Sequence, residues 1–424
     1  MLPLDTRPNV GAICISNKGV AITTGGTAVD VAIPDTSYGP VPTRIRLAAT
    51  AACYARLGTP GEGPAAVTAG GTGYVTGDNV TLVGGTYTKP MTFAPATLAL
   101  LSAAVDDPGS GYAKDDTITV LGGTAATKAI LDVATTQLVS ADLDAAGTGY
   151  VPADTITLAG GTAGTAAVVT VATTKAVSAT VATGGAGDLG GGAGVIVEGT
   201  TGTGTKFRAS VTIASNAIAS VQSITVAGAY TVNPTLITAE PVIYISGASS
   251  GDTLTGAELS VVFGVGTFAI TTPGSYTVES ATFTQASTSG SGTDATFDTG
   301  LYGVLTTTIN TAGVYSVTTP TFAQHATSGG GTGATFDTGV YKLLTVTVDD
   351  PGAYTVQPTN PAATTTDGDG EDATLTVTWA EAAAAGDMLI QPGDAIVLDA
   401  VGFDHVSAIQ DSGAGILVVT PVEN

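Results

Sequence analysis

Few residues in this chain of 424 amino acids could carry acid–base chemistry, since it holds only two histidines, His325 and His405. His325 follows Gln324 inside a repeated segment, where the preceding copy has Ser287 or a close neighbour, and His405 follows Asp404 at an expected strand or turn. We interpret both histidines as ordinary polar residues. No phosphate-binding Walker loop or His-Glu-x-x-His motif accompanies them.

Carboxylates are the other candidates, because glycosidases, including phage depolymerases, use them in pairs. Most acidic residues here fall at expected turns, as at 106–107, 115–116 and 349–350, where Asp is favoured for conformational reasons. Asp367, Asp369 and Asp372 lie close together and are weak candidates for a Ca²⁺ site, but their spacing is not that of an EF-hand. A solvated turn is the simpler interpretation. We therefore expect no enzyme, no catalytic residue and no cofactor, with Ca²⁺ as the metal to consider.

Two further features have ordinary explanations. Strings that resemble Gly-x-Gly-x-x-Gly occur near 73–77 and 187–192, but they open no expected helix, so we dismiss nucleotide binding. Cys14 and Cys53 both lie in apolar runs and are expected to be small buried hydrophobic residues. A disulfide between them stays open, because it depends on geometry.

The composition favours strands and turns over helices. Gly accounts for 58 residues, aromatic side chains for 5% and charged side chains for 11%, while hydrophobic residues reach 43%. Thr and Val suit pleated strands, Gly suits tight turns, and so high a hydrophobic content is not typical of disorder. The formal net charge of −23 would repel phosphate backbones, which makes nucleic acid an unlikely partner. The N-terminus has no secretory-signal pattern and no run is apolar enough for a bilayer, so we expect synthesis in a cytoplasm without membrane insertion.

An internal repeat is the strongest signal in the chain. Gly-x-Gly-Tyr occurs at 71–74, 109–112 and 147–150, so its tyrosines stand 38 residues apart, and Gly-Gly-Thr keeps the same step at 84–86, 122–124 and 160–162. A degenerate copy follows at 185–188 and 198–200. In the later half, Gly-x-Tyr recurs at 228–230, 274–276, 313–315 and 352–354, with steps of 46, 39 and 39 residues. We count about eight copies between residues 66 and 380.

Each copy predicts three short strands separated by glycine turns. Residues 117–121 and 155–158 alternate polar and apolar side chains, as half-buried strands do. Units this small must stack on neighbouring copies or on other chains. We expect the repeat tyrosines to pack their rings over the joints between copies and to keep their hydroxyls in water, with sugar stacking as the alternative role. These tyrosines are Tyr74, Tyr112, Tyr150, Tyr230, Tyr276, Tyr315 and Tyr354.

The repeat resembles the Gly-Ser-Gly-Tyr modules, here residues 109–112, that recur in bacteriophage fibre and virion proteins, and similar modules occur in bacterial surface proteins. The resemblance covers most of residues 66–380 and implies an architecture more than a function.

The two ends of the chain lack the repeat and are expected to belong together. Residues 1–60 and 383–424 offer short, evenly spaced strands, and joined they have the size of one β-sandwich. The sequence thus predicts an all-β chain, namely a discontinuous β-sandwich interrupted by a tandem array of β repeats of 38–39 residues. Within the array, residues 61–223 carry the Gly-x-Gly-Tyr/Gly-Gly-Thr type and residues 224–382 the Gly-x-Tyr-Thr-Val type.

The joined ends resemble a class of small phage structural proteins with capsid-decoration or head-fibre-like domains. The resemblance rests on residues 44–58, 387–393, 405–409 and 413–420, about a quarter of the chain. It implies a virion structural protein on the particle exterior, as capsid decoration or head fibre. The main alternative is a tail fibre that recognises host surface glycans; a cell-surface adhesin and a depolymerase are further ones. Expected partners are other copies, as a homotrimer, the major capsid protein and host glycans.

Overall fold

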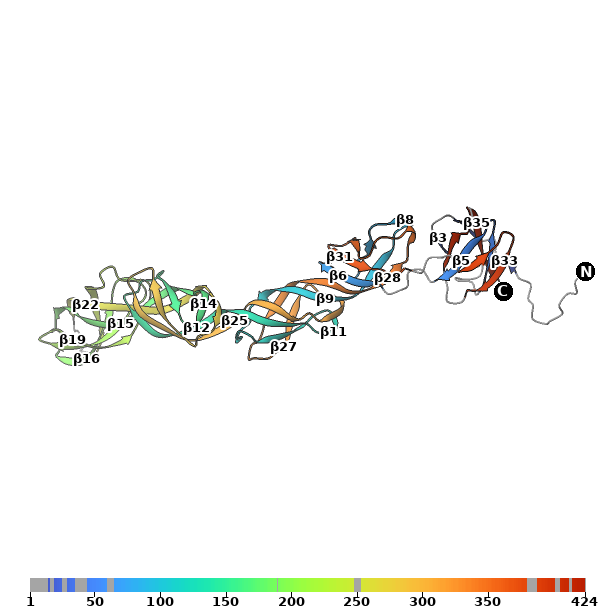
Figure 1. The fold of residues 1–424 in the computed structure, drawn as a ribbon. Helices are drawn as coiled ribbons and strands as arrows, with labels where there is room; N and C mark the ends of the chain where they lie inside the picture. The colour runs from blue at the N-terminus through green and yellow to red at the C-terminus, as the bar shows by residue number, and fades with distance from the viewer. Residues whose placement is uncertain are drawn as a thin grey trace, which may run out of the picture.

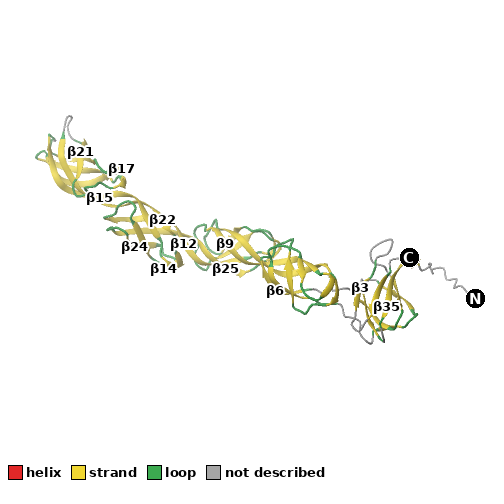
Figure 2. Ribbon diagram, turned by 90° about the horizontal axis from the view of Figure 1, so that it is seen from above, coloured by secondary structure: helices red, strands yellow, loops and turns green. Residues whose placement is uncertain are grey.

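The computed structural model describes residues 14–15, 19–24, 29–34, 44–58, 65–188, 190–247, 253–379, 387–400, 405–411 and 414–423. Strands, turns and bends make up this part of the chain, with no residue in a helix, which confirms the all-β class. The molecule is a long rod with a small β-domain at one end (Figures 1 and 2).

The small domain is built from both ends of the chain. Its first sheet, called sheet 1 below, contains β1 (Cys14–Ile15), β35 (Gly415–Glu423), β4 (Arg44–Ala49) and β33 (Ala395–Asp399), and β2 (Val20–Thr24) also pairs with β35. Its second sheet, sheet 2, has the order β3 (Val29–Ala32), β34 (His405–Gln410), β5 (Cys53–Gly58) and β32 (Met388–Ile390). Every pairing between these strands is antiparallel.

Side chains alternate between the inner and outer faces of the sheets, and those on the inner faces form one core between sheet 1 and sheet 2. Along β4 the burial pattern alternates, so that Ile45 and Leu47 point inward while Arg44 and Arg46 point outward. Ile45 and Leu47 pack in one cluster with Cys53 and Val406 of sheet 2. Cys53 is a free, fully buried thiol, and burial raises its pKa. The side chain of Cys14 lies outside the described residues.

The rod is formed by a chain that runs out and then back. Three pairs of long antiparallel strands follow one another along it: β9 (Thr92–Asp107) with β28 (Thr335–Asp350), β12 (Ile130–Thr148) with β25 (Thr293–Thr311), and β15 (Val168–Gly187) with β22 (Leu254–Thr272). Each outgoing copy therefore pairs with a returning copy. The last long outgoing strand, β15, pairs with the first long returning strand, β22. The expectation that copies stack on neighbouring copies or on other chains did not include this pairing between distant copies of the same chain.

Shorter strands close the rod into four modules, numbered from the sandwich outward. Module 1 adds β6 (Ala66–Thr72), β7 (Val80–Leu82), β8 (Thr86–Lys89), β29 (Ala353–Val356), β30 (Ala362–Thr366) and β31 (Glu371–Thr376). Module 2 adds β10 (Thr117–Leu121), β11 (Thr124–Thr127), β26 (Val314–Val317) and β27 (Phe322–Thr327). Module 3 adds β13 (Thr155–Ala159), β14 (Thr162–Thr165), β23 (Ser275–Val278) and β24 (Thr282–Thr288). Module 4 adds β16 (Gly192–Gly199), β17 (Thr203–Thr205), β18 (Arg208–Ala214), β19 (Ala217–Val226), β20 (Ala229–Val232) and β21 (Glu240–Ser246).

The Gly-Gly-Thr motif makes a turn that other residues would not tolerate. In module 3, Gly161 has a φ of 66° between β13 and β14, a conformation that suits glycine. A Cβ on Gly161 would stand 2.2 Å from the carbonyl oxygen of Val278 on the returning strand β23. The glycine therefore allows the outgoing turn to lie directly against the returning chain.

Side chains of this one chain fill the interior of the rod. One cluster of buried side chains spans modules 1 and 2, and separate clusters fill modules 3 and 4. The homotrimer was expected because thin units with few aromatic residues need partners. Here the returning half supplies that partner, so this reason for a trimer no longer holds. The trimer remains a prediction without structural support.

Candidate functional site

The repeat tyrosines lie inside the modules and not on their surface. Six of them, all except Tyr354, are at most 2% exposed, and Tyr354 is half-buried. Glycines cover the rings of the outgoing set: a Cβ on Gly331 would stand 2.2 Å from the ring of Tyr112, and one on Gly292 would stand 2.3 Å from the ring of Tyr150. Stacking on a sugar is therefore unavailable to the buried rings.

The tyrosine hydroxyls are bonded to protein groups, which corrects the expectation that they stay in water. Each returning tyrosine accepts a hydrogen bond from one backbone N–H of the outgoing chain: Met91 to Tyr354 at 3.1 Å, Ala129 to Tyr315 at 3.1 Å, Ala167 to Tyr276 at 3.0 Å and Phe207 to Tyr230 at 2.9 Å. The outgoing tyrosines Tyr112 and Tyr150 donate to the side-chain oxygens of Gln324, at 2.6 Å, and of Gln285. Tyr112 also accepts from the N–H of Ala334 at 3.3 Å. Tyrosine thus fastens the outgoing half to the returning half in every module.

Burial has an electrostatic consequence for these phenols. Loss of solvation disfavours the phenolate and raises the pKa of Tyr230, as well as of the long-strand tyrosines Tyr302 and Tyr341, to about 12. The hydrogen bonds that these hydroxyls accept from the backbone oppose this shift only in part. The phenols therefore stay protonated near neutral pH, where their hydroxyls serve as hydrogen-bond partners.

The sequence interpretation placed Asp116 at a turn but missed that the same turn aspartate recurs in the other outgoing copies. Asp78, Asp116 and Asp154 each come four residues after the repeat tyrosine, and each accepts a hydrogen bond from the N–H three residues earlier, at 2.9, 2.9 and 3.0 Å. Asp78 and Asp154 are 7% exposed, so their carboxylates serve the turn and are little available to a ligand. The Tyr-x-x-x-Asp spacing at 74–78, 112–116 and 150–154 was the signal in the sequence that could have identified them.

Successive modules meet at three joints with the same backbone geometry. One hydrogen bond recurs at each joint, from Leu100 N to Ala312 O at 2.9 Å, from Leu138 N to Pro273 O at 2.9 Å and from Ala176 N to Ala227 O at 2.8 Å. The long strands also run through the joints without a break. The rod is therefore continuous sheet from module to module and not a string of separate domains.

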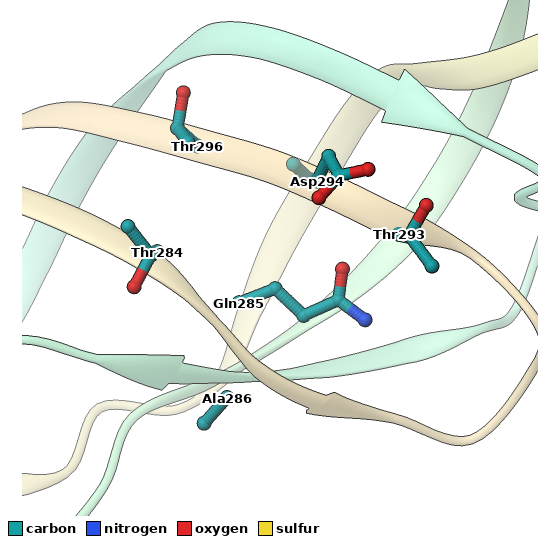
Figure 3. A pocket seen from close by; sticks show the side chains of 7 residues that line it. Thr284, Gln285, Ala286, Thr293, Asp294 and Thr296 are labelled. Carbon is teal, nitrogen blue, oxygen red and sulfur yellow. The ribbon is translucent and has the colours of Figure 1, made fainter.

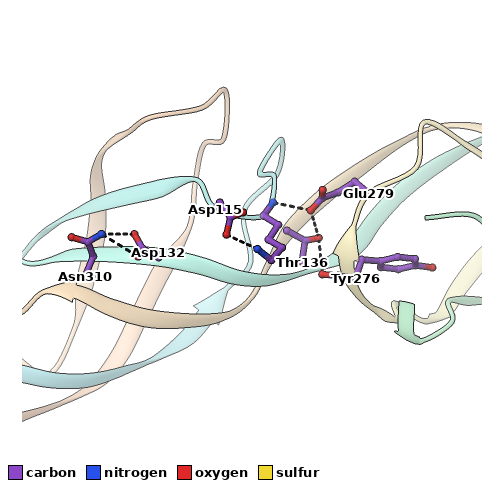
Figure 4. A network of polar contacts seen from close by, with 7 residues as sticks. Asp115, Asp132, Thr136, Tyr276, Glu279 and Asn310 are labelled. Atoms are coloured by element: carbon purple, nitrogen blue, oxygen red, sulfur yellow. Dashed lines mark hydrogen bonds and ion pairs between the residues drawn. The ribbon is translucent and has the colours of Figure 1, made fainter. Parts of the chain in front are cut away.

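The polar side chains at the joints differ from one joint to the next. Between modules 1 and 2, the N–H of Thr76 donates to the hydroxyl of Thr318 at 3.1 Å. Between modules 2 and 3, Glu279 accepts from the N–H of Lys114 at 2.8 Å and from the buried hydroxyl of Thr136 at 2.7 Å (Figure 4).

At the third joint, between modules 3 and 4, the hydrogen-bond donor comes from the returning chain and not from the outgoing chain. The residue that corresponds to Thr76 and Lys114 is Pro152, which has no N–H to donate. Asn233 instead donates its amide to the carbonyl oxygen of Tyr150 at 2.9 Å and accepts from the buried hydroxyl of Thr174. Each joint thus has its own complementary pair, so near-identical repeats are distinguished by their partners.

The three weak Ca²⁺ candidates occupy turns in the structure. Asp367 accepts a hydrogen bond from the N–H of Asn79 at 2.7 Å and so bridges two turns, while Asp372 occupies a turn position with a φ of 60°. Among the described residues, Asp367, Asp369 and Asp372 do not join in a group of ligands able to hold a metal ion. The interpretation as a turn accounts for the acidic run.

Neither histidine lies in a catalytic arrangement that the structure describes. His325 on β27 has its Nε2 3.0 Å from the Nζ of Lys128, and no carboxylate or nucleophile is placed with it in a described contact. His405 pairs with Ala32 through the backbone of β34 and β3, and its side chain lies outside the described residues. The turn carboxylates are also occupied, since Asp107 and Asp350 accept from the N–H groups of Gly109 and Gly352, both at 2.8 Å.

Module 3 has two shallow hollows on its sides. One, of ≈ 360 Å³, lies between β24 and β25 and is lined by Thr284, Gln285, Ala286, Thr293, Asp294, Ala295 and Thr296 (Figure 3). The amide of Gln285 is already bonded to Tyr150 and to the carbonyl of Gly292, which leaves threonine hydroxyls and Asp294 at its surface. The other, of ≈ 550 Å³, lies between β12 and β22 and includes Asp142, Leu143 and Phe268. These open, mixed hollows suit weak surface contacts better than an enclosed ligand.

Within the described residues, no helix is present that is long and apolar enough to span a membrane. In comparisons with protein-family models, with curated proteins and with solved structures, nothing matched this chain. Its function must therefore be argued from its own geometry.

Proposed function

We propose that the chain is a non-enzymatic structural protein on the exterior of a bacteriophage particle, serving as capsid decoration or head fibre. One observation carries the proposal: both ends of the chain enter a single sandwich, and the array leaves it and returns to it. A molecule of this shape has one base and one free end, which suits attachment at the base and projection of the rod.

The stiffness of the rod supports projection. Long strands cross each joint, and backbone hydrogen bonds recur there, so bending a joint would break sheet hydrogen bonds. At ~3.3 Å per residue, a strand of 19 residues such as β12 extends on the order of 60 Å, and three such pairs overlap end to end. A flexible linker of comparable length would instead coil.

The charge distribution agrees with an external position. Residues 61–382 hold 26 of the 35 acidic residues and 7 of the 12 basic ones, a formal charge of −19. A surface this acidic is repelled by nucleic acid and by other copies of the rod, which keeps projecting rods apart.

The test is the copy number of the chain in purified particles of the phage that encodes it, measured by quantitative mass spectrometry against the major capsid protein. A count on the order of hundreds would match a symmetric shell decorated at repeated positions. A count of a few tens or fewer would favour a tail position, and absence from particles would refute the proposal.

The second candidate is a tail fibre or receptor-binding protein that recognises host surface glycans. The hydroxyl- and carboxylate-lined hollows of module 3 favour it. The repeat tyrosines do not, because their rings are buried. Copy number separates this candidate from the first.

A further inference from the structure

The outward face of sheet 1 differs from an ordinary solvated sheet face. Because Ile45 and Leu47 point into the core, Arg44, Arg46 and Ala48 point outward. The register of the sheet continues the row through Ala48: Ala21 lies opposite Val418, Val418 opposite Ala48, and Ala48 opposite Ala395. One row across four strands is thus entirely apolar.

Two larger apolar side chains flank this row. Ile416 on β35 is 42% exposed and Val397 on β33 is 41% exposed. An antiparallel sheet with one solvated face normally alternates apolar-in with polar-out residues, and this face breaks the pattern at its centre. Contiguous exposed apolar side chains are one feature of interaction surfaces.

Positive charge borders the patch. Arg46 lies opposite Val397 on one side and Thr420 on the other, and no ion pair joins it to another described residue. Arg44 stands at the edge opposite Asp399. Four of the five arginines of this acidic chain occur in residues 1–60, whereas the rod segment 61–382 contains one.

The position of the face is as informative as its composition. In Figure 1, β3 of sheet 2 lies on the side of the sandwich toward the rod, where it contacts β29, whereas β33 of sheet 1 lies on the far side; Figure 2 also places β3 closer to the rod than β35. The outward face of sheet 1 is therefore at the base of the molecule, pointing away from the rod.

We propose that this face, centred on Ala48 and Val418 and bordered by Arg46, docks the chain onto a protein surface that presents apolar side chains flanked by carboxylates. The inference rests on the proposed function, since the partner would be a protein of the particle shell. Apolar burial supplies affinity, and the arginines orient the contact through complementary charge. Nucleic acid fits less well, because residues 1–60 and 383–424 together carry 5 basic and 9 acidic residues.

The test uses the full-length chain and purified particles that lack it. Val397→Asp places a charge in the exposed apolar region, and Arg46→Glu reverses the bordering charge. Matched controls on the rod are Val278→Asp, where the wild-type valine is 54% exposed, and Lys128→Glu. Co-sedimentation with particles gives the dissociation constant, and circular dichroism verifies that each variant is folded. If Arg46→Glu disturbs the sandwich, Val397→Asp on the exposed strand β33 still gives a readable result.

We expect each sheet 1 variant to bind at least about tenfold more weakly than wild type, each control to bind as wild type, and wild-type binding to weaken as salt is raised. Wild-type protein that does not bind particles would refute the proposed function itself. Wild-type binding that Val397→Asp and Arg46→Glu leave unchanged would overturn only the docking face. The docking proposal would also be overturned if nuclease abolished binding, or if the two variants changed the oligomeric state of the free protein, which would assign the face to nucleic acid or to a second copy.

Discussion

Replacing Tyr276 with phenylalanine tests whether the repeat tyrosines fasten the outgoing chain to the returning chain. The hydroxyl of Tyr276 accepts the hydrogen bond from the N–H of Ala167 at 3.0 Å, and both residues are fully buried. Tyr276→Phe keeps the ring and its edge contact with Tyr302, whose centroid is 5.4 Å away, but leaves the N–H of Ala167 without its acceptor. A buried unsatisfied donor costs about 1–3 kcal/mol.

The matched control is Tyr87→Phe, because Tyr87 is 43% exposed and should lose less than about 0.5 kcal/mol. Urea unfolding measures the free energy of unfolding of both variants, and hydrogen exchange measures opening at the Ala167 amide. We expect Tyr276→Phe to lower the unfolding midpoint and to speed exchange of that amide. Equal stability of the two variants, with unchanged exchange at Ala167, would refute the fastening role.

Two further predictions concern the tyrosines and the pairing of the repeats. The pKa of Tyr230, Tyr302 and Tyr341 is about 12 in the folded chain and 10.0 for an exposed phenol, so the unfolded chain loses these protons first as pH rises. Their contribution is complete below pH 10 and lost between pH 10 and 12, on the order of 3 kcal/mol per tyrosine. The melting temperature should therefore fall steeply over this range, and a flat profile would contradict the reasoning. Deleting residues 112–149 together with 264–302 removes one outgoing and one matching returning copy, and should yield a folded, shorter rod by small-angle X-ray scattering. Either deletion alone leaves strands without partners and should aggregate; a folded monomer from the single deletion of 112–149 would contradict the pairing.

Local structure was predictable from this sequence because it depends on neighbouring residues. Alternation in residues 117–121 and 155–158 indicated strands, and β10 and β13 occupy these segments with alternating burial. The glycine turns between them also form where the Gly-Gly-Thr motif stands, because positive φ at Gly161 is a local requirement.

Long-range pairing was not predictable, because the repeats resemble one another. Any outgoing copy could pair with several returning copies on the basis of strand pattern alone. The choice is made by joint residues such as Glu279 and Asn233, whose partners lie 165 and 83 residues away. Nothing in the local pattern identifies such partners. For the same reason the tyrosine hydroxyls were expected to lie in water, since the chain that covers them comes from the opposite half of the sequence.

The central claim is that the sandwich is the base of a rod whose far end, module 4, projects from a particle. An epitope inserted between Ser215 and Asn216, in the turn between β18 and β19, would mark module 4. Gold-labelled antibody and cryo-electron microscopy of purified particles would then locate this turn relative to the shell. We predict label at the outer ends of projections, separated from the shell by the length of the rod. Label lying against the shell, or particles without label, would contradict the account.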